Sequence, residues 1–324
     1  MCIRDRTYSK HTIDYPYPVA ISVNAKSIGM EYPMICFNYG RCEDDGTYSE
    51  RTKYGMIGVI IHEVGHNFFP MIINSDERQW TWMDEGLNTF VQFLTEKEFD
   101  RDYPSRRGSA RNIRDYMGGD KTRISPIMTN SESIYQFGNN AYGKPATALN
   151  ILRETVMGRE LFDHAFKEYS RRWAFKHPSP ADFFRTLEDA SGVDLDWFWR
   201  GWFYTTDHCD IAMEDIKWLQ MDSGDPDVEA SLRKAADERK PEDVTQMRNA
   251  DGGIPQSYLE ADPTLNDFYT TTGKYEVLEL DRQEAAEAMA KLSDDEKALL
   301  ASGKQHYEIT FRNIGGLVMP LILE

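Results

Sequence analysis

The sequence is poor in cysteine and in positive charge. Its four cysteines, at positions 2, 36, 42 and 209 of 324 residues, are too few for a disulfide framework and lack the spacing of a zinc knuckle. Cys36 and Cys42 could pair, but free thiols are the favoured interpretation. The 37 Lys and Arg residues stand against 54 Asp and Glu, a formal charge of −17. A nucleic-acid partner is therefore not expected, because there is no basic excess to neutralise phosphates.

Long apolar runs and a recognisable leader are also missing. No run approaches about 18 consecutive apolar residues, so no transmembrane segment is predicted. The start, MCIRDRTYSK, lacks the apolar core of a secretory signal peptide. At the other end, the apolar run from Gly316 to Glu324 has a β-pattern without partner strands. We therefore expect a fragment cut at both ends, whose true N-terminus is missing.

Hydrophobic periodicity predicts a mainly α chain with some β-structure near each end. Residues 1–45 are β-leaning, and residues 46–207 are predicted to be helical, starting at a capping box of Thr47 and Glu50. Residues 208–324 return to β-structure around an acidic segment at about 222–305, interpreted as a solvated insertion. The expected helices cover residues 53–69, 83–99, 141–157, 159–175, 180–190, 194–204 and 281–303, and the expected strands cover 210–220, 306–313 and 317–324. In the polar stretch 101–140, the arginines at 106, 107, 111 and 114 are interpreted as part of a solvated loop rather than as a cluster that steers acidic peptides.

The residues that carry chemistry are His62, Glu63 and His66 in the sequence HEVGH. On a helix, His62 and His66 lie one turn apart on the same face, where two neutral imidazoles can bind one zinc ion. Glu63 lies about 100° round the helix from His62, close enough to act as general base on a zinc-activated water. A five-residue pattern of this kind also occurs by chance, so the zinc hypothesis depends on further residues.

A zinc site that stays open to water needs a third protein ligand. Phe69 and Ile72 stand where a metzincin would have Gly and His, which excludes that arrangement. A carboxylate from a following helix is the other common solution. Glu85 follows His66 after eighteen intervening residues, at the start of the next expected helix. Asp84 is the adjacent competitor, or a partner that holds a ligand imidazole.

The pattern HExxH, eighteen residues and then Glu-Gly resembles the gluzincin zinc metallopeptidases of the aminopeptidase N family. That family carries a Gly-x-Met-Glu-Asn strand upstream of the zinc helix, and Ile28-Gly29-Met30-Glu31-Tyr32 stands at the matching distance. Met30 and Glu31 match, whereas Ile28 and Tyr32 replace the usual Gly and Asn. The resemblance implies that Gly29, Met30 and Glu31 line the substrate site and that Glu31 binds the substrate's free α-amino group, a pairing that a carboxylate makes well.

A second motif extends the resemblance. Ala141-Tyr142-Gly143-Lys144-Pro145 is similar to the family's Tyr-x-Lys-Gly motif, with Pro in place of Gly. The family's Tyr donates a hydrogen bond to the oxyanion of the tetrahedral intermediate, as a phenol can. Tyr142 matches by motif, and Tyr135 is the nearby alternative.

The resemblance covers roughly residues 20–220 and implies a thermolysin-like helical zinc-peptidase catalytic domain. A small β region lies on its N-terminal side, with the IGMEY strand in residues 1–45, the zinc site lies in 46–207, and 208–324 begin an incomplete β-sandwich domain. One zinc ion would be bound by His62, His66 and Glu85, with Glu63 and Tyr142 as the catalytic residues.

The implied activity is removal of the N-terminal residue from peptides with a free N-terminus. The alternatives are a thermolysin-like endopeptidase, which would not need Glu31, and, less favoured, a non-catalytic interaction protein that keeps the fold. Bacterial relatives with this layout are often exported, so a periplasmic or otherwise exported location is the weak expectation. Oligomeric state and the preferred N-terminal residue stay open.

Overall fold

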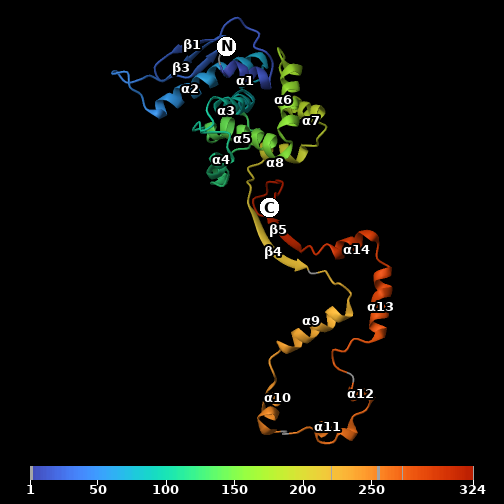
Figure 1. Ribbon diagram of the computed structural model, residues 1–324. Helices are drawn as coiled ribbons and strands as arrows, with labels where there is room; N and C mark the ends of the chain where they lie inside the picture. Colours follow the sequence, from blue (N-terminus) through green and yellow to red (C-terminus); the bar gives the residue numbers. More distant parts are fainter. Residues whose placement is uncertain (1–2, 220, 254–255, 272, 324) are drawn as a thin grey trace. The chain divides into compact units, whose positions relative to one another are not determined.

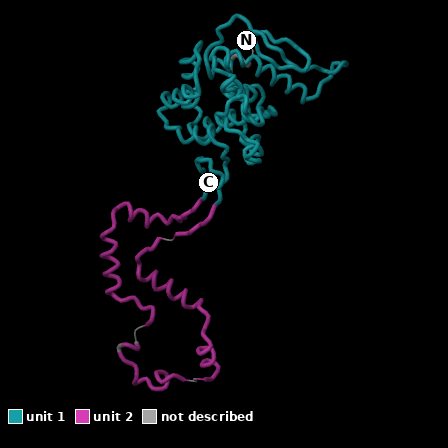
Figure 2. Tube along the Cα trace, turned by 180° about the vertical axis from the view of Figure 1, so that it is seen from behind, with its two compact units in different colours: residues 1–212, 312–324 teal, residues 213–311 magenta. Residues whose placement is uncertain are grey.

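The computed structural model describes residues 3–219, 221–253, 256–271 and 273–323. The chain divides into two compact units, Met1–Ala212 with Arg312–Glu324, and Met213–Phe311 (Figure 2). Figure 1 shows that helices dominate both units, which confirms the predicted mainly helical fold with a small N-terminal sheet. The two regions predicted to form the catalytic domain fall in the first unit, and the β-sandwich assignment of 208–324 stays a prediction.

A small mixed sheet lies near the start of unit 1. Its strands are β1 (Ile21–Asn24), β2 (Met30–Tyr32) and β3 (Ile35–Asn38), in the order β1-β3-β2. β1 runs parallel to β3 and β2 runs antiparallel to it, with Glu31 opposite Cys36. The sheet packs on α2 (Glu50–Gly65), so the Gly29–Glu31 segment lies along the helix that carries both histidines. No disulfide joins Cys36, which is a buried residue of β3, to Cys42, which is exposed.

The start and the end of α2 both differ from the prediction. Ser49, not Thr47, is the N-cap, since its Oγ accepts a hydrogen bond from the backbone N–H of Thr52 at 3.1 Å. Thr47 instead donates its hydroxyl to Asp45 at 2.7 Å. The α-helix ends at Gly65 and is followed by a π-helical turn, η1 (Asn67–Ile72), whose helical geometry breaks at the residue before Pro70. Pro70 lies inside this turn, and the break falls on Phe69 because the residue before a proline is disfavoured in helical geometry.

The remaining helices of unit 1 form the body of the domain. α1 precedes the sheet, in a segment that was expected to be β-leaning, and it packs against α3. α4 forms within the stretch that was expected to be a solvated loop. The elements are α1 (Ile3–His11), η2 (Trp82–Gly86), α3 (Leu87–Phe99), α4 (Ala110–Met117), η5 (Gly138–Gly143), α5 (Lys144–Ile151), η6 (Leu152–Val156), α6 (Arg159–Trp173), α7 (Pro180–Ser191) and α8 (Asp196–Tyr204), with short 3₁₀ turns at η3 (Lys121–Arg123) and η4 (Ser131–Ser133).

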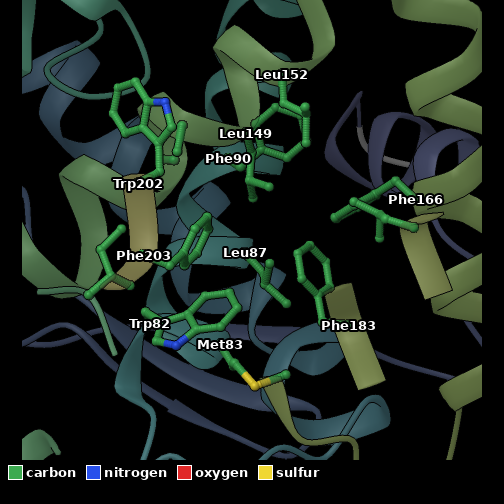
Figure 3. Packing of buried hydrophobic residues seen from close by; sticks show 14 of the residues in the cluster. Trp82, Met83, Leu87, Phe90, Leu149, Leu152, Phe166, Phe183, Trp202 and Phe203 are labelled. Atoms are coloured by element: carbon green, nitrogen blue, oxygen red, sulfur yellow. The ribbon is translucent and has the colours of Figure 1, made fainter. Parts of the chain in front are cut away.

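An aromatic core holds these helices together (Figure 3). Trp82 is buried between rings from α7 and α8, with ring centroids 5.9 Å from Phe184 and 4.9 Å from Phe203. Leu87 and Phe90 of α3 are fully buried in the same cluster. Each such side chain contributes about 1.5–3 kcal/mol by burial. The turn at 82–86 is thereby fixed to the core on one side, and Glu85 projects from its other side toward α2.

The loop after α3 is held firmly against α2 and α3. Tyr103 is buried, and its hydroxyl donates to the backbone carbonyl of Tyr54 at 2.5 Å. Lys97 of α3 donates to the carbonyl of Tyr103 at 2.7 Å. Gly108 has φ +90° and lies so close to the Phe93 ring that a Cβ would collide with it. Burial and packing thus hold this segment against the two helices. Arg106, Arg111 and Arg114 are exposed, as a solvated loop predicts, whereas Arg107 is half-buried.

Unit 2 joins two strands through a series of short, exposed helices. β4 (Ile211–Leu219) and β5 (His306–Asn313) form a two-stranded sheet, close to the two expected strands. The third expected strand, 317–324, is wrong as far as residue 323, because residues 317–323 form no strand. An isolated bridge between His208 and Gly316 lies directly before them. The helices are α9 (Pro226–Glu238), α10 (Val244–Arg248), α11 (Tyr258–Ala261), α12 (Phe268–Thr271), α13 (Glu279–Ala290) and α14 (Asp294–Ala301), with the turns η7 (Asn249–Gly253) and η8 (Pro263–Leu265). None of the described helices is both long and apolar enough to cross a bilayer.

Candidate active site

His62 and His66 project from one face of α2 toward a common point. Their Nε2 atoms are 3.1 Å apart and their rings are nearly perpendicular, with centroids 4.6 Å apart. The one-turn spacing on a regular helix brings the two nitrogens together, as the sequence predicts. Both side chains are largely buried, which keeps the site low in dielectric.

Glu85 completes a three-ligand cluster with these two histidines. Its Oε2 lies 3.0 Å from Nε2 of His62 and 3.4 Å from Nε2 of His66. Tetrahedral zinc with ligand bonds of about 2.0–2.1 Å places neighbouring ligand atoms roughly 3.3 Å apart. Two imidazoles and one carboxylate are also the donor set of many catalytic zinc sites, so the residues fit one zinc ion in both chemistry and spacing.

The outer nitrogen of each imidazole has its own partner. Nδ1 of His62 lies 2.9 Å from Oε1 of Gln92. Nδ1 of His66 lies 2.8 Å from the carbonyl oxygen of Phe69 and 2.8 Å from Oδ1 of Asp84. Asp84 therefore contacts the nitrogen of His66 that faces away from His62, which is the position of a partner that orients an imidazole rather than of a ligand.

Burial and the neighbouring carboxylates set the pKa values of the two histidines. Burial lowers the pKa of His62. Burial also acts to lower the pKa of His66, but its hydrogen bonds with Asp84 and Glu85 outweigh that and raise the pKa well above its usual value. The pKa of Glu85 is lowered because its bonds to both histidines outweigh its burial. Since zinc binds neutral imidazole, loading the site releases protons and is favoured by higher pH.

Glu63 lies next to the cluster as a nearly buried carboxylate. Burial raises its pKa to about 7, with the charges of Glu31 and Glu85 adding and that of His66 opposing. A carboxylate with a pKa near neutrality is suited to take up and return a proton. The strand segment at Gly29 lies directly against it, because a Cβ on Gly29 would be 2.6 Å from Oε1 of Glu63.

Tyr142 reaches the cluster from η5. Its hydroxyl donates to Oε1 of Glu85 at 2.5 Å, and its ring stacks on His62 with centroids 5.7 Å apart. Burial, together with the charge of Glu85, raises the pKa of Tyr142, so it remains a neutral hydrogen-bond donor at ordinary pH. The alternative, Tyr135, is 60% exposed and does not line this site.

One cavity of about 600 Å³ is lined by every residue that was predicted to bind zinc, to bind substrate or to act in catalysis, apart from the alternative Tyr135. Glu31 of β2 is half-buried in its wall, and burial raises the pKa of its carboxyl group. The polar rim adds residues that sequence reasoning did not select. The lining consists of Gly29, Met30, Glu31, His62, Glu63, His66, Glu77, Arg78, Thr81, Asp84, Glu85, Ser131, Glu132, Phe137 and Tyr142.

Comparison with known proteins shows the family of this chain. The model of the peptidase family M1 domain matches residues 5–202. The chain belongs to peptidase family M1. The predicted resemblance to gluzincin metallopeptidases of the aminopeptidase N type is thereby confirmed.

The relatives of this M1 domain are distant. "Probable aminopeptidase 1" of Sulfurisphaera tokodaii is 25% identical over 167 residues, which are 49% of this chain and 21% of that protein. The glutamyl aminopeptidase of Sus scrofa is 25% identical over 180 residues, which are 54% of this chain and 19% of that protein. The chain thus spans about a fifth of the length of these curated relatives. Among solved structures, an M1 zinc metallopeptidase from Deinococcus radiodurans is 19% identical with a TM-score of 0.49, covering 63% of this chain and 43% of that one.

Sequence reasoning missed two residues next to the site of this M1 domain. Gln92 lies seven residues, or two helical turns, after Glu85, so the helical period could have identified it as a partner for a ligand. Arg107 stacks on the ring of Tyr142 with its guanidinium carbon 4.2 Å from the ring centroid. No local pattern indicated that contact, because it depends on the path of the loop after α3.

Proposed function

We propose that this chain is the catalytic domain of a zinc-dependent aminopeptidase that removes the N-terminal residue from peptides. The observation that carries the proposal is the position of Glu31, which lines the same cavity as His62, Glu63, His66 and Glu85. A carboxylate there can pair with the free α-ammonium group of a substrate and so place the first peptide bond at the zinc site.

Each side chain has a separate task in this proposal. His62, His66 and Glu85 would hold one zinc ion, which supplies Lewis-acid polarisation and a water of lowered pKa when bound. Glu63 takes the proton of the attacking water and later gives it to the leaving amine. Tyr142 turns its hydroxyl from Glu85 to the substrate's carbonyl oxygen and donates a hydrogen bond as negative charge develops there.

A thermolysin-like endopeptidase is the main alternative. It would use the same zinc ligands and Glu63 but would have no need of an anchor for the α-amino group. The two functions therefore differ in one measurable property, namely the requirement for a free N-terminus. A non-catalytic protein is the weaker alternative, because the ligands, the base and the phenol all lie together.

The test compares aminoacyl fluorogenic amides with their N-acetylated counterparts on zinc-loaded protein. We expect cleavage of the free-amine substrates only, loss of cleavage in Glu63→Gln, and one zinc per chain by elemental analysis in both proteins. Equal cleavage of blocked and free substrates would favour the endopeptidase. Absence of bound zinc in folded protein would contradict both peptidase functions.

A further inference from the structure

The contact between Arg107 and Tyr142 has no part in the chemistry described so far. The guanidinium carbon lies 4.2 Å from the centroid of the Tyr142 ring, well inside the range of a cation–π interaction. Arg107 is half-buried, and burial lowers the pKa of its guanidinium group. No described Asp or Glu forms a salt bridge with it. A partly desolvated cation without an ion pair is stabilised here by the π-face of the phenol.

The packing of the loop after α3 fixes the position of Arg107 next to Tyr142. Gly108 lets the backbone pass directly against Phe93 of α3, where any side chain at 108 would collide with the ring. Tyr103, five residues away, bonds to the backbone of α2. The loop is therefore fixed to α2, which carries the two histidines, and to α3, which directly follows the turn that carries Glu85. This places the guanidinium group of Arg107 beside the Tyr142 ring.

Tyr142 is thus held from several directions. The His62 ring stacks on it at 5.7 Å with an interplanar angle of 22°, and the Phe137 ring meets it at 6.0 Å with an angle of 65°. Arg107 adds the only charged contact with its ring among the described residues. A cation over the ring also withdraws electron density from the phenol, which strengthens its hydroxyl as a donor.

We propose that Arg107 is a positioning residue that holds the Tyr142 ring, by a cation–π contact, in the orientation from which its hydroxyl reaches the substrate's carbonyl oxygen. The proposal rests on the proposed function, because the orientation matters to catalysis only if Tyr142 acts on substrate. Arg107 is not among the residues that line the cavity, so it would act through Tyr142 rather than on the substrate.

The test is a double-mutant cycle on the zinc-loaded chain of 324 residues. Arg107→Gln should lower kcat by about tenfold with little change in KM. Tyr142→Phe should lower kcat by about 10²–10³-fold. Arg107→Gln added to Tyr142→Phe should have an effect of less than about twofold, because the group through which it acts is gone. Arg111→Gln, which removes the same charge from an exposed position on α4, is the matched control and should leave kcat unchanged.

Arg107→Lys keeps the charge but loses the flat guanidinium group, so it should restore part of the lost kcat. It also serves for the cycle if Arg107→Gln does not fold. An equal loss from Arg107→Gln in the wild-type and Tyr142→Phe backgrounds would overturn the proposal, as would a kcat of Arg107→Gln equal to that of Arg111→Gln.

A second readout does not depend on activity. In protein with ¹³Cζ-labelled tyrosine, the resonance missing from Tyr142→Phe identifies Tyr142. Arg107→Gln should shift that resonance, whereas Arg111→Gln should not. A shifted resonance in protein that hydrolyses no substrate would support the contact and contradict the proposed function. An unshifted resonance with unchanged kcat in an active enzyme would contradict the role of Arg107 and leave the function standing.

Discussion

At the scale of single residues, Gly29 packs closely against the side chain of Glu63. A Cβ at position 29 would lie 2.6 Å from Oε1 of Glu63 and 3.7 Å from Val59. Since the atom in the way is the end of a flexible side chain, Gly29→Ala should displace the carboxylate rather than unfold the protein. We expect kcat to fall by about tenfold or more, because a proton-transfer group moved by about 1 Å loses much of its effect, while bound zinc stays at the wild-type level.

Gly55→Ala is the matched control for this change. Gly55 lies on the same helix as Glu63, and a Cβ there would meet nothing within 4 Å. It should leave kcat unchanged and stabilise the helix by up to about 1 kcal/mol. Steady-state kinetics and thermal melts of the two variants check both statements. Wild-type kcat in Gly29→Ala would contradict the placement of Glu63 as the base.

The contact of Gln92 with His62 leads to a separate prediction about the affinity for zinc. Its Oε1 lies 2.9 Å from Nδ1 of His62, and its amide nitrogen donates to Glu96 at 2.8 Å. Gln92→Ala removes the group that fixes the tautomer and orientation of the imidazole, so zinc should bind about 10–100-fold more weakly. Competition with a chromophoric chelator measures this affinity. Gln79→Ala, which changes an exposed glutamine, should leave it unchanged, and equal affinities in the two variants would refute the role of Gln92.

At the scale of elements, a buried ammonium group links α5 to the chain after α8. Lys144 is 1% exposed, and its Nζ donates to the carbonyl of Thr205 at 3.0 Å. Burial lowers the pKa of Lys144 from 10.5 to about 8, with the charge of Lys121 adding and that of Asp207 opposing. Between these two pKa values the unfolded chain binds more protons than the folded one, so the site's contribution to the free energy of unfolding rises with pH across that window.

Lys144→Met should remove this pH dependence. The difference in free energy of unfolding, wild type minus variant, should rise by about 3 kcal/mol between about pH 7.5 and pH 10.5. Denaturant titrations at several pH values measure it. Lys26→Met, at an exposed position, should give a difference that is flat over the same range. A flat difference for Lys144→Met would show that its ammonium group is not desolvated in solution.

Elements with strong local signals were predictable from the sequence. The helix expected at 180–190 forms as α7, and it starts at a capping box in which Ser179 and Asp182 make both reciprocal hydrogen bonds. Elements that depend on contacts with residues distant in the sequence were not predictable. α1 is fixed by Tyr8, which is buried against Phe68 and bonds to the side chain of Asn88. Its own pattern is polar, so nothing local indicated that it would be helical.

Within the candidate active site, too, local patterns were predictable and contacts between distant residues were not. Residues with a fixed spacing on one helix, such as His62 and His66, follow from the sequence because the helical period alone places them. Their convergence with Glu85 needed the resemblance to a family as well as the spacing. Arg107 could not be predicted, because its position depends on a glycine that packs against Phe93 and on no local pattern.

At the scale of the whole molecule, the two units differ in how they are stabilised. Unit 1 contains the aromatic core, whereas Ala230 is the one buried residue among those described in unit 2. A segment with so little burial opens at a low free-energy cost. Limited trypsin digestion of the zinc-loaded chain should therefore cut first within residues 222–305. Zinc content and hydrolysis should survive that first cut, and an early cut within residues 46–207 would contradict this prediction.

The pairing of β4 with β5 also determines which insertions and deletions the chain can accept without a change in the zinc-binding residues. The chain leaves unit 1 after Ala212 and re-enters it at Arg312, and the two strands that carry it out and back are hydrogen-bonded neighbours. Lengthening a loop costs only about 0.6 kcal/mol for each doubling of its length. The segment between the strands can therefore grow, shrink or be exchanged for a foreign module while His62, His66 and Glu85 keep their spacing. The segment between β4 and β5 is therefore a suitable place to insert another domain without changing the residues of the candidate active site.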